Sequence, residues 1–471
     1  MVLLSLVLPI RAVKPDNRNK SIANHFQRIR KSPVLLRQFL LEMPKGGDLH
    51  NHLTGAVYAE TLIDLSVQKN LCVTQDSTLL SNPPKIQGIT VPISEAYENG
   101  NLYERIVENW SMYNFHPAKS SSNHHFFKIF PQTALAVTNL TAILNKLRIR
   151  ADRENLLYLE TMLQIDDGTE KIRALVTDLA RPDQLKSKKD FLQFREKLIK
   201  KKEFILEIDR VISQIQKIKE TSDRQLKGKP GAAVETRFQY YALRVLPRNL
   251  VLADIITAFV IAEKSPLVVG TNIVGPENNY TARKDYAVHM EMISVIGSIY
   301  PGVKRDLHAG ELVLGQAVPE ALRFHIREAV DVAGADRIGH GVDIAYEKGA
   351  LDTIKKMKEK KIAIEILLTS NQELLGVKGK QHPFTFYVDA GVPVVLSGDD
   401  PGIFRTTQTE EFYLAVSRYP EIKYPHIKRF VYNSIQYSFL QSSKKQALMK
   451  RLSKKFNGFE EKWLKKINKY F

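Results

Sequence analysis

Short apolar runs recur along the chain, and each is followed by a longer segment. Several runs are continuous, not alternating, which is typical of strands covered on both faces, as in a parallel sheet. A strand followed by a helical segment, repeated along the chain, predicts parallel βαβ units. The predicted strands lie at residues 46–53, 155–162, 237–246, 266–273, 305–309, 336–340, 361–368 and 392–398. The sequence therefore predicts an α/β fold, a (β/α)₈ TIM-type barrel with inserted helical segments.

Helical patterns occupy part of the space between the later strands. Apolar residues recur at steps of three and four over residues 317–333, which predicts a helix there, and a second helix is predicted over 350–360. Gly391 follows a helical stretch and has the position of a glycine that ends a helix. These helices fit the crossover connections of a barrel.

Two segments are too long to be single crossover helices. Residues 60–150 predict a barrel helix plus an added helical subdomain. Residues 170–229 carry an amphipathic repeat whose spacing places its apolar residues on one helix face. The repeat consists of Phe191, Phe194, Leu198, Ile205, Ile208, Ile212 and Ile215. Such a stripe most often packs on a core, and a partner chain or an anionic surface are the alternatives.

These patterns divide the chain into three parts. Residues 1–40 form an N-terminal segment, residues 41–443 the barrel with its insertions, and residues 444–471 a basic C-terminal helix. Residues 1–10 resemble the core of a signal peptide, although no basic residue precedes them. This run is too short to span a bilayer. We expect a soluble protein, and the sequence leaves open whether it is cytoplasmic or exported.

The charge of the chain is strongly positive. Lys and Arg number 69 against 51 Asp and Glu, which gives a net charge of +18. Much of the excess lies in residues 186–229 and 444–469. A Lys-rich stretch is most often a solvated face, but it also attracts anions. Contact of the basic helical region with an anionic surface, and a non-catalytic polyanion-binding or signalling function, are therefore alternatives.

Cysteine is nearly absent, since Cys72 is the single one among 471 residues. A disulfide framework within the chain and a Cys-rich zinc site are thereby excluded. The zinc deaminases that act on bases in nucleic acid use a P-C-x-x-C motif, so that class is excluded as well. Any metal site must use His, Asp and Glu.

Polar residues with metal-binding chemistry follow the first and fifth predicted strands. His50 and His52 are two positions apart on a strand and therefore point to the same face. His308 ends the fifth strand, and Glu311 follows it after two small residues. In barrels of this type, the carboxyl ends of the strands form the active site.

Two further motifs follow the sixth and eighth strands. His340 lies between two glycines, and Asp399 precedes Asp400 in a turn-forming Asp-Asp-Pro sequence. Adjacent carboxylates repel each other unless a cation is near. Three nitrogens of His50, His52 and His308 with one oxygen of Asp399 make a suitable set for zinc. Glu311, His340 and Asp400 then remain for proton chemistry.

The motifs together resemble the adenosine deaminase family of amidohydrolase-type barrels. The region after the first strand is similar to that of the larger, growth-factor-type members. The matching stretches are KGGDLHNHLTG (45–55), LVVGTNIVGPE (267–277), LHAGE (307–311), RIGHG (337–341), TSN (369–371) and SGDDPGIF (397–404).

The resemblance implies hydrolytic deamination of adenosine or deoxyadenosine to the inosine compound and ammonia. It implies one zinc ion per chain, held by His50, His52, His308 and Asp399. It also implies a small purine nucleoside and water as partners. No nucleic acid is required, and a homodimer is left open. The implied roles are proton donation to purine N1 by Glu311, orientation and deprotonation of the attacking water by His340 with Asp399, a hydrogen bond to N7 by Asp400, and contact with the purine edge by the backbone around Gly275.

Some positions depart from the family pattern. Thr54 stands where an acidic residue helps to hold the 5′ hydroxyl of the sugar, and Asn272 stands where an aspartate is common. Both are expected to contact the substrate. These two departures therefore concern which nucleoside is bound and not the deamination reaction. The alternatives on the same barrel are hydrolysis of another aminopurine, an amide or an ester, because one fold hosts many reactions.

Overall fold

The computed structural model describes residues 17–81, 90–118 and 120–470, so the signal-like residues 1–10 lie outside the described part. Eight parallel strands follow one another around a single sheet in chain order. They are β1 (Gly46–His52), β5 (Leu156–Leu163), β6 (Glu235–Leu243), β7 (Val268–Val274), β8 (Lys304–Ala309), β9 (Arg337–His340), β10 (Ala363–Ile366) and β11 (Val394–Leu396). All eight predicted strands are confirmed within a few residues.

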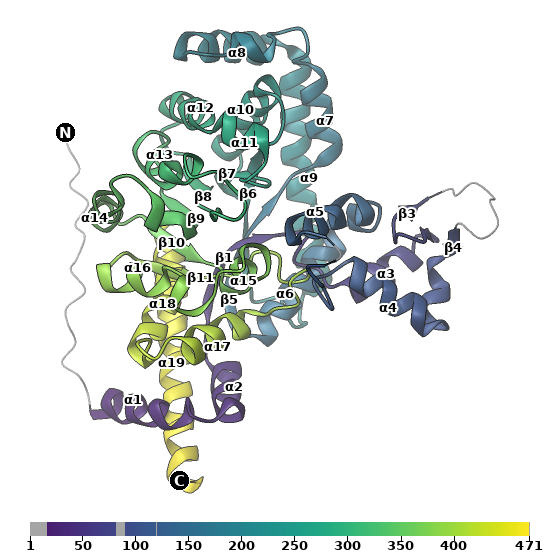
Figure 1. Cartoon of the computed structure of the whole chain (residues 1–471). Helices are drawn as coiled ribbons and strands as arrows, with labels where there is room; N and C mark the ends of the chain where they lie inside the picture. The colour runs from purple at the N-terminus through teal and green to yellow at the C-terminus, as the bar shows by residue number, and fades with distance from the viewer. Residues whose placement is uncertain (1–16, 82–89, 119, 471) are drawn as a thin grey trace.

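The sheet closes between its first and last strands. Asn51 and Asp399 form a parallel bridge. The amide of His52 donates to the carbonyl of Asp399, and the amide of Asp399 donates to the carbonyl of His50, both at 3.0 Å. The predicted (β/α)₈ barrel is therefore confirmed (Figure 1). Its seam lies among the predicted site residues.

Helices surround the barrel as the crossover pattern requires. The almost wholly buried α10 (Arg248–Lys264) packs on β6 and β7, and α18 (Tyr424–Gln436) packs on β1 and β11. Further helices between and after the barrel strands are α11 (Tyr280–Lys284), α12 (Tyr286–Ile299), α15 (Leu368–Leu375) and α17 (Gln408–Arg418). Such two-sided cover accounts for the continuous apolar strands.

The later helices agree only partly with the sequence pattern. The helix α14 (Ala350–Lys360) is confirmed, and Gly391, with a φ of 80°, ends α16 (Phe384–Ala390). The helix predicted over 317–333 is instead a 3₁₀ turn (Ala321–Arg323) followed by the short α13 (His325–Asp331). The apolar periodicity does not reveal this break, because the 3₁₀ turn and α13 both bury their apolar residues.

The first insertion contains a small sheet that the sequence did not predict. After α3 (Ala59–Val67), the strands β2 (Cys72–Thr74), β3 (Leu79–Leu80) and β4 (Thr90–Pro92) pair antiparallel. They are too short to show an alternating pattern. Three helices follow, α4 (Gly100–Asn109), α5 (Ser122–Thr133) and α6 (Leu140–Arg153), and α6 leads back to the barrel. In Figure 1, the small sheet lies at the end of an arm beside the barrel.

The second insertion is a set of three helices, α7 (Asp166–Ala174), α8 (Lys188–Lys200) and α9 (Lys202–Leu226). The interpretation of the repeat as one helix face is wrong, because Lys201 is extended and separates α8 from α9. Phe191 and Phe194 on α8, and Ile208 and Ile215 on α9, are nevertheless buried. The two helices turn their stripes onto the same core, with α8 against α12 and α9 against α6 and α7.

The ends of the described chain pack together under the barrel. The helix α19 (Ser442–Tyr470) contacts α18 and α1 (Asn17–Ile29). Phe39 of α2 (Pro33–Glu42) contacts Phe459 and Trp463 edge to face. Trp463 also donates its ring N–H to Glu42 at 2.9 Å. The segments before and after the barrel therefore share one apolar core with it (Figure 1).

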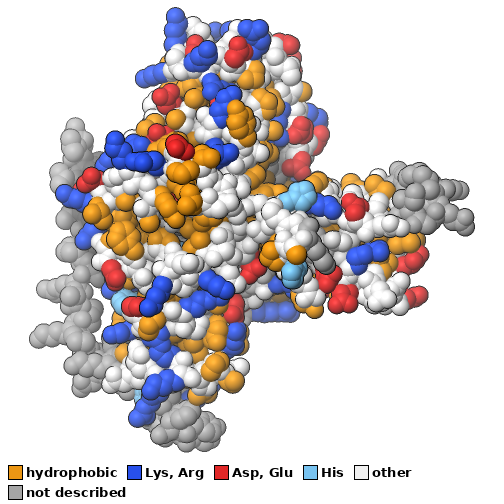
Figure 2. Space-filling model, viewed as in Figure 1, with side chains coloured by type: hydrophobic (Ala, Val, Ile, Leu, Met, Phe, Trp, Pro, Cys, Tyr) orange, Lys and Arg blue, Asp and Glu red, His pale blue; other side chains and the backbone are white. Residues whose placement is uncertain are grey.

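The basic side chains do not gather in one place on the face seen in Figure 2. Lys and Arg are spread over the upper, middle and lower parts of this face and are interspersed with Asp and Glu. Contact with an anionic surface stays a prediction. Among the described helices, none is both long and apolar enough to cross a bilayer.

Candidate active site

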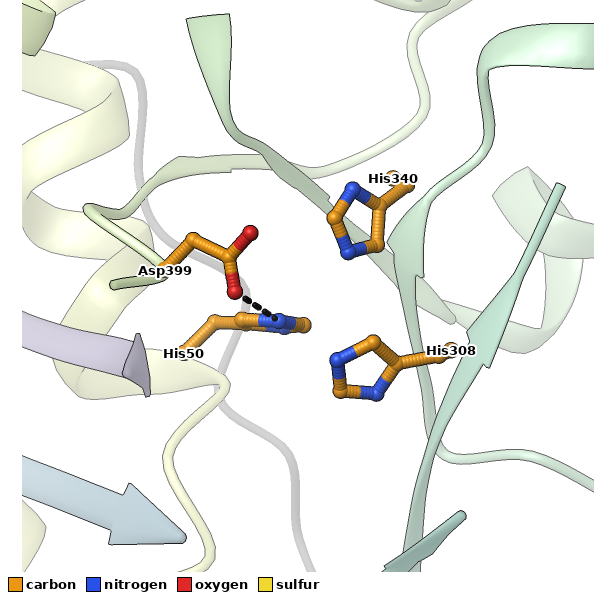
Figure 3. Close-up of side chains that lie close together, drawn as sticks. All are labelled: His50, His308, His340 and Asp399. Carbon is orange, nitrogen blue, oxygen red and sulfur yellow. Dashed lines mark ion pairs between the residues drawn. The ribbon is translucent and has the colours of Figure 1, made fainter. Parts of the chain in front are cut away.

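Four side chains from distant parts of the chain converge at the carboxyl ends of the strands. His50 lies on β1, His308 on β8 and His340 on β9, and Asp399 follows β11. Each offers one ligand atom within 4.8 Å of those of the others (Figure 3). All four are buried. The barrel thus collects the predicted metal and proton-transfer residues in one place.

His52 joins this cluster through Asp399. The Oδ1 atom of Asp399 lies 3.3 Å from Nε2 of His52 and 3.5 Å from Nε2 of His50. The ring centroids of His52 and His308 are 5.3 Å apart. Burial alone would raise the pKa of Asp399, but the neighbouring imidazoles of His50 and His52 hold it well below its usual value. Asp399 is therefore an anion between two imidazoles.

The hydrogen bonds behind two of the imidazoles leave a nitrogen lone pair facing the cluster. Nδ1 of His50 donates to Glu365 at 2.7 Å, and Nδ1 of His308 donates to Asn272 Oδ1 at 2.8 Å. Burial lowers the pKa of His308, whereas for His50 the carboxylates of Asp399 and Glu365 outweigh burial and raise the pKa. In its neutral form, which is the form that binds a metal ion, each ring has one N–H, and its Nε2 atom is then an acceptor. Nε2 of His50 is buried and has no hydrogen-bond partner among the described residues. Metal-binding imidazoles have this arrangement.

His340 has the opposite arrangement. The amide of Phe384 donates to Nδ1 of His382 at 3.1 Å, so His382 carries its proton on Nε2 and donates to Asn371 Oδ1 at 3.0 Å. The amide nitrogen of Asn371 therefore faces Nδ1 of His340, at 2.9 Å, and donates to it. His340 then has its proton on Nε2, an atom that is buried without a partner in the described structure. This ring presents a hydrogen-bond donor to the cluster, not a lone pair.

Backbone strain and close approaches are concentrated at the same place. His340 and Asp399 have φ values of 70° and 62°, in the left-handed region that residues other than glycine rarely adopt. A Cβ atom on Gly339 would lie 2.5 Å from Cε1 of His50, and one on Gly55 would lie 1.6 Å from Oδ1 of Asp400. Strain of this kind is typical of functional sites.

Glu311 lies beside the cluster, with Oε1 3.6 Å from Nδ1 of His340. Burial and the negative charges of Asp399 and Glu277 raise its pKa well above the usual range. A raised pKa favours the protonated form of the Glu311 carboxyl, which is the form that can donate a proton. Burial and the neighbouring Asp399 likewise raise the pKa of Asp400 well above its usual value.

Glu277 holds the loop that carries Glu311, a role that sequence reasoning missed. Its carboxylate accepts the backbone amides of Gly310 at 3.0 Å and Glu311 at 2.8 Å, and Nδ1 of His325 donates to it at 2.6 Å. Burial would raise the pKa of Glu277, but the charge of Arg244 and the His325 hydrogen bond lower it to about 2. The GPE stretch was part of the family resemblance, but no local pattern connects it to Glu311.

A buried charge network lies behind His50. Glu365, which accepts from His50, is 2.6 Å from Nε of Arg337. The same guanidinium contacts Glu160 at 2.5 Å and Asp306 at 2.9 Å. Because these side chains are fully buried, the network fixes the orientation of the His50 ring.

A large cavity opens from the cluster towards the insertions. Thr54, Gly275 and Asp400 line it, as expected for substrate-binding residues, together with Glu311. Asn272 does not, which differs from the expectation. Its Oδ1 accepts from His308, and its amide nitrogen donates to Gln239 at 3.0 Å. Asn272 therefore orients a histidine and faces away from the substrate.

Comparison with known proteins agrees with this geometry. The family model described as adenosine deaminase matches residues 169–455, which contain His308, Glu311, His340 and Asp399. An adenosine deaminase from Clostridium botulinum is 26% identical over 212 residues, which cover 42% of this chain and 58% of that protein. The chain thus matches little more than half the length of this relative.

Two solved structures share the fold. An adenine deaminase from Arthrobacter aurescens superimposes with a TM-score of 0.55 at 17% identity, over 87% of this chain and 98% of the other. An amidohydrolase from Burkhoderia ambifaria with bound Zn gives a TM-score of 0.53 at 15% identity, over 96% of each chain.

Proposed function

Because the chain belongs to the adenosine deaminase family, we propose that it hydrolyses adenosine or deoxyadenosine to inosine or deoxyinosine and ammonia. The observation that carries this proposal is the placement of Glu311. A mostly buried carboxyl whose raised pKa favours the protonated form lies beside a cluster with metal-binding chemistry and lines the cavity.

The donor set fits one zinc ion. His50 and His308 turn acceptor nitrogens to the cluster, and Asp399 contributes an anionic oxygen next to His52. Since His340 presents an N–H there, we assign the metal to His50, His52, His308 and Asp399. A zinc ion bound by these residues would supply Lewis acidity, because it lowers the pKa of a coordinated water from about 15.7 towards 7.

The other side chains move protons and orient the substrate. Glu311 protonates purine N1, which allows C6 to become tetrahedral when the water oxygen adds to it. His340 donates its Nε2–H to that oxygen and so orients the water. In this proposal it does not act as the base that the family resemblance implies. The C6–N bond then breaks. One proton of the water passes through the Asp399 carboxylate to the leaving amine, which departs as ammonia, and the other restores the proton that Glu311 gave to N1.

Asp400 fits the N7 side of the purine. Its Oδ1 is buried and has no hydrogen-bond partner within the described residues, and its raised pKa makes the carboxyl a hydrogen-bond donor. A protonated Asp400 can therefore donate to the N7 lone pair. Gly275, with a φ of 100°, brings backbone to the cavity wall without a side chain.

The test is a panel of 6-aminopurines, with deamination followed by its ultraviolet change and zinc measured per chain. We expect turnover of adenosine or deoxyadenosine with one zinc per chain. If every aminopurine is inert while the metal is loaded, hydrolysis of an amide or ester on the same barrel replaces the proposal. Two tightly held metals would indicate phosphoester hydrolysis.

A further inference from the structure

The cavity is larger than an adenine nucleoside requires. Its volume is about 1130 Å³, whereas pockets for drug-sized ligands measure about 300–1,000 Å³. His52, His308, His340 and Asp399 of the cluster form only a small part of its lining. A second region lies between the two insertions, and we call it the outer compartment. It is lined by Phe127, Phe130, Thr133, Leu140, Ile218 and Thr221.

The walls of the outer compartment are built from side chains on regular helices. Gln214, Lys217, Ile218 and Thr221 on α9 are separated by three, one and three positions, so they form one stripe that faces the cavity. At 1.5 Å per residue, this stripe runs for about 10 Å. Phe126 and Phe130 are four positions apart on α5 and line the cavity as well.

The proposed reaction fixes which end of the substrate reaches this compartment. C6 must face the cluster, N1 must face Glu311, and N7 must face Asp400. The free edge of the purine then carries N9 and its sugar, and this edge points away from the base of the cavity. Whatever extends the sugar at its 5′ position therefore enters the outer compartment.

The charges at the rim do not favour a phosphate there. Asp166, Asp167, Arg173 and Lys217 line this part of the cavity. Arg173 is bound to Asp254 by two hydrogen bonds of 3.0 and 2.7 Å, so its charge is already neutralised. Asp166 and Lys217 carry opposite charges and form no ion pair within the described part of the chain, so this part of the cavity offers a dianion no net positive charge. Thr54, nearer the base, adds a neutral hydroxyl.

We propose, on the basis of the proposed function, that the preferred substrates are adenine nucleosides enlarged at the 5′ position by an uncharged, mainly apolar group, which lies between α5 and α9. Its methylenes leave water for contacts with Phe127, Phe130 and Ile218. Burial of one methylene gains up to about fourfold in binding.

The test compares kcat/KM of the unaltered enzyme for adenosine, its 5′-methylthio and 5′-butylthio derivatives, and AMP. We expect the value to rise by about tenfold or more from the methylthio to the butylthio compound. We expect AMP to be the poorest substrate. A flat or falling alkylthio series, or a preference for AMP, overturns the inference while deamination of adenosine upholds the proposed function. If none of the four is deaminated, the proposed function itself fails.

Two matched serine variants on α9 locate the effect. Ile218→Ser should lower the ratio of kcat/KM for the butylthio compound to that for adenosine by about tenfold. Leu206→Ser removes an apolar side chain that is 58% exposed on the same helix, and the ratio should stay within about twofold. Equal ratios in both variants would overturn the placement of the 5′ group. The substrate series on the unaltered enzyme remains decisive even if Ile218→Ser does not fold.

Discussion

Replacement of Glu311 by glutamine separates catalysis from folding. The two side chains have the same shape, and the backbone amide of residue 311 still donates to Glu277. Burial and the charges of Asp399 and Glu277 raise the pKa of Glu311, which favours its uncharged form. A neutral amide therefore takes the place of a neutral acid, and we expect the free energy of unfolding to change by less than about 1 kcal/mol.

The catalytic loss should be large. Glutamine cannot deliver a proton to N1, and general acid catalysis contributes about 10²–10⁴-fold, or about 3–5 kcal/mol of transition-state stabilisation. In the unaltered enzyme, kcat/KM should fall as pH rises through the raised pKa of Glu311, since the acid form is the active one. The stability of the unaltered protein should also decline from about pH 4.3 upwards, because only the unfolded chain loses this proton there. Both dependences should disappear in the variant.

The assay measures kcat/KM by the ultraviolet change, zinc by elemental analysis and stability by urea denaturation. Glu320→Gln, at an exposed position after the same strand, is the matched control and should retain full activity. A Glu311→Gln enzyme within tenfold of normal activity, with zinc bound, would refute the assignment of Glu311 as the proton donor.

Three further outcomes follow from the contacts of the site. His50→Ala and Asp399→Ala should each lose the metal, and full zinc occupancy in both by elemental analysis would contradict the ligand set. Asn371→Asp should place a proton on Nδ1 of His340 and lower kcat at least about 100-fold, whereas unchanged activity would show that this ring acts as a base. Glu277→Gln should lower the free energy of unfolding by about 3–5 kcal/mol, because a buried arginine loses its counter-charge. A change below 1 kcal/mol in urea denaturation would contradict that estimate.

The sequence predicts those strands and site residues that can be recognised from neighbouring positions in the chain. Several barrel strands are short apolar runs, and His50, His308 and Asp399 stand at or just after the ends of predicted strands, so these three residues could be placed without coordinates. Glu311 was found in the same way, three positions after His308. The barrel itself supplies the convergence, since parallel strands bring their carboxyl ends to one rim.

The residues that the sequence could not assign act across the fold. Glu365 contacts His50 although the two are 315 positions apart, and the orientation of His340 depends on His382 through Asn371. Asn272 was expected on the substrate because it follows a family position, yet its oxygen faces His308. The break at Lys201 also escaped periodicity, because the apolar spacing continues across it.

The seam of the barrel affects how the protein is made. The first strand carries His50, and its partner across the seam is the segment that carries Asp399, one of the last barrel elements to be synthesised. Nascent domains fold as the chain emerges from the ribosome. A chain that has emerged only as far as β10 can neither close the cylinder nor gather the full set of side chains. Activity should therefore appear only after the segment that carries Asp399 has emerged, and products truncated before it should be inert.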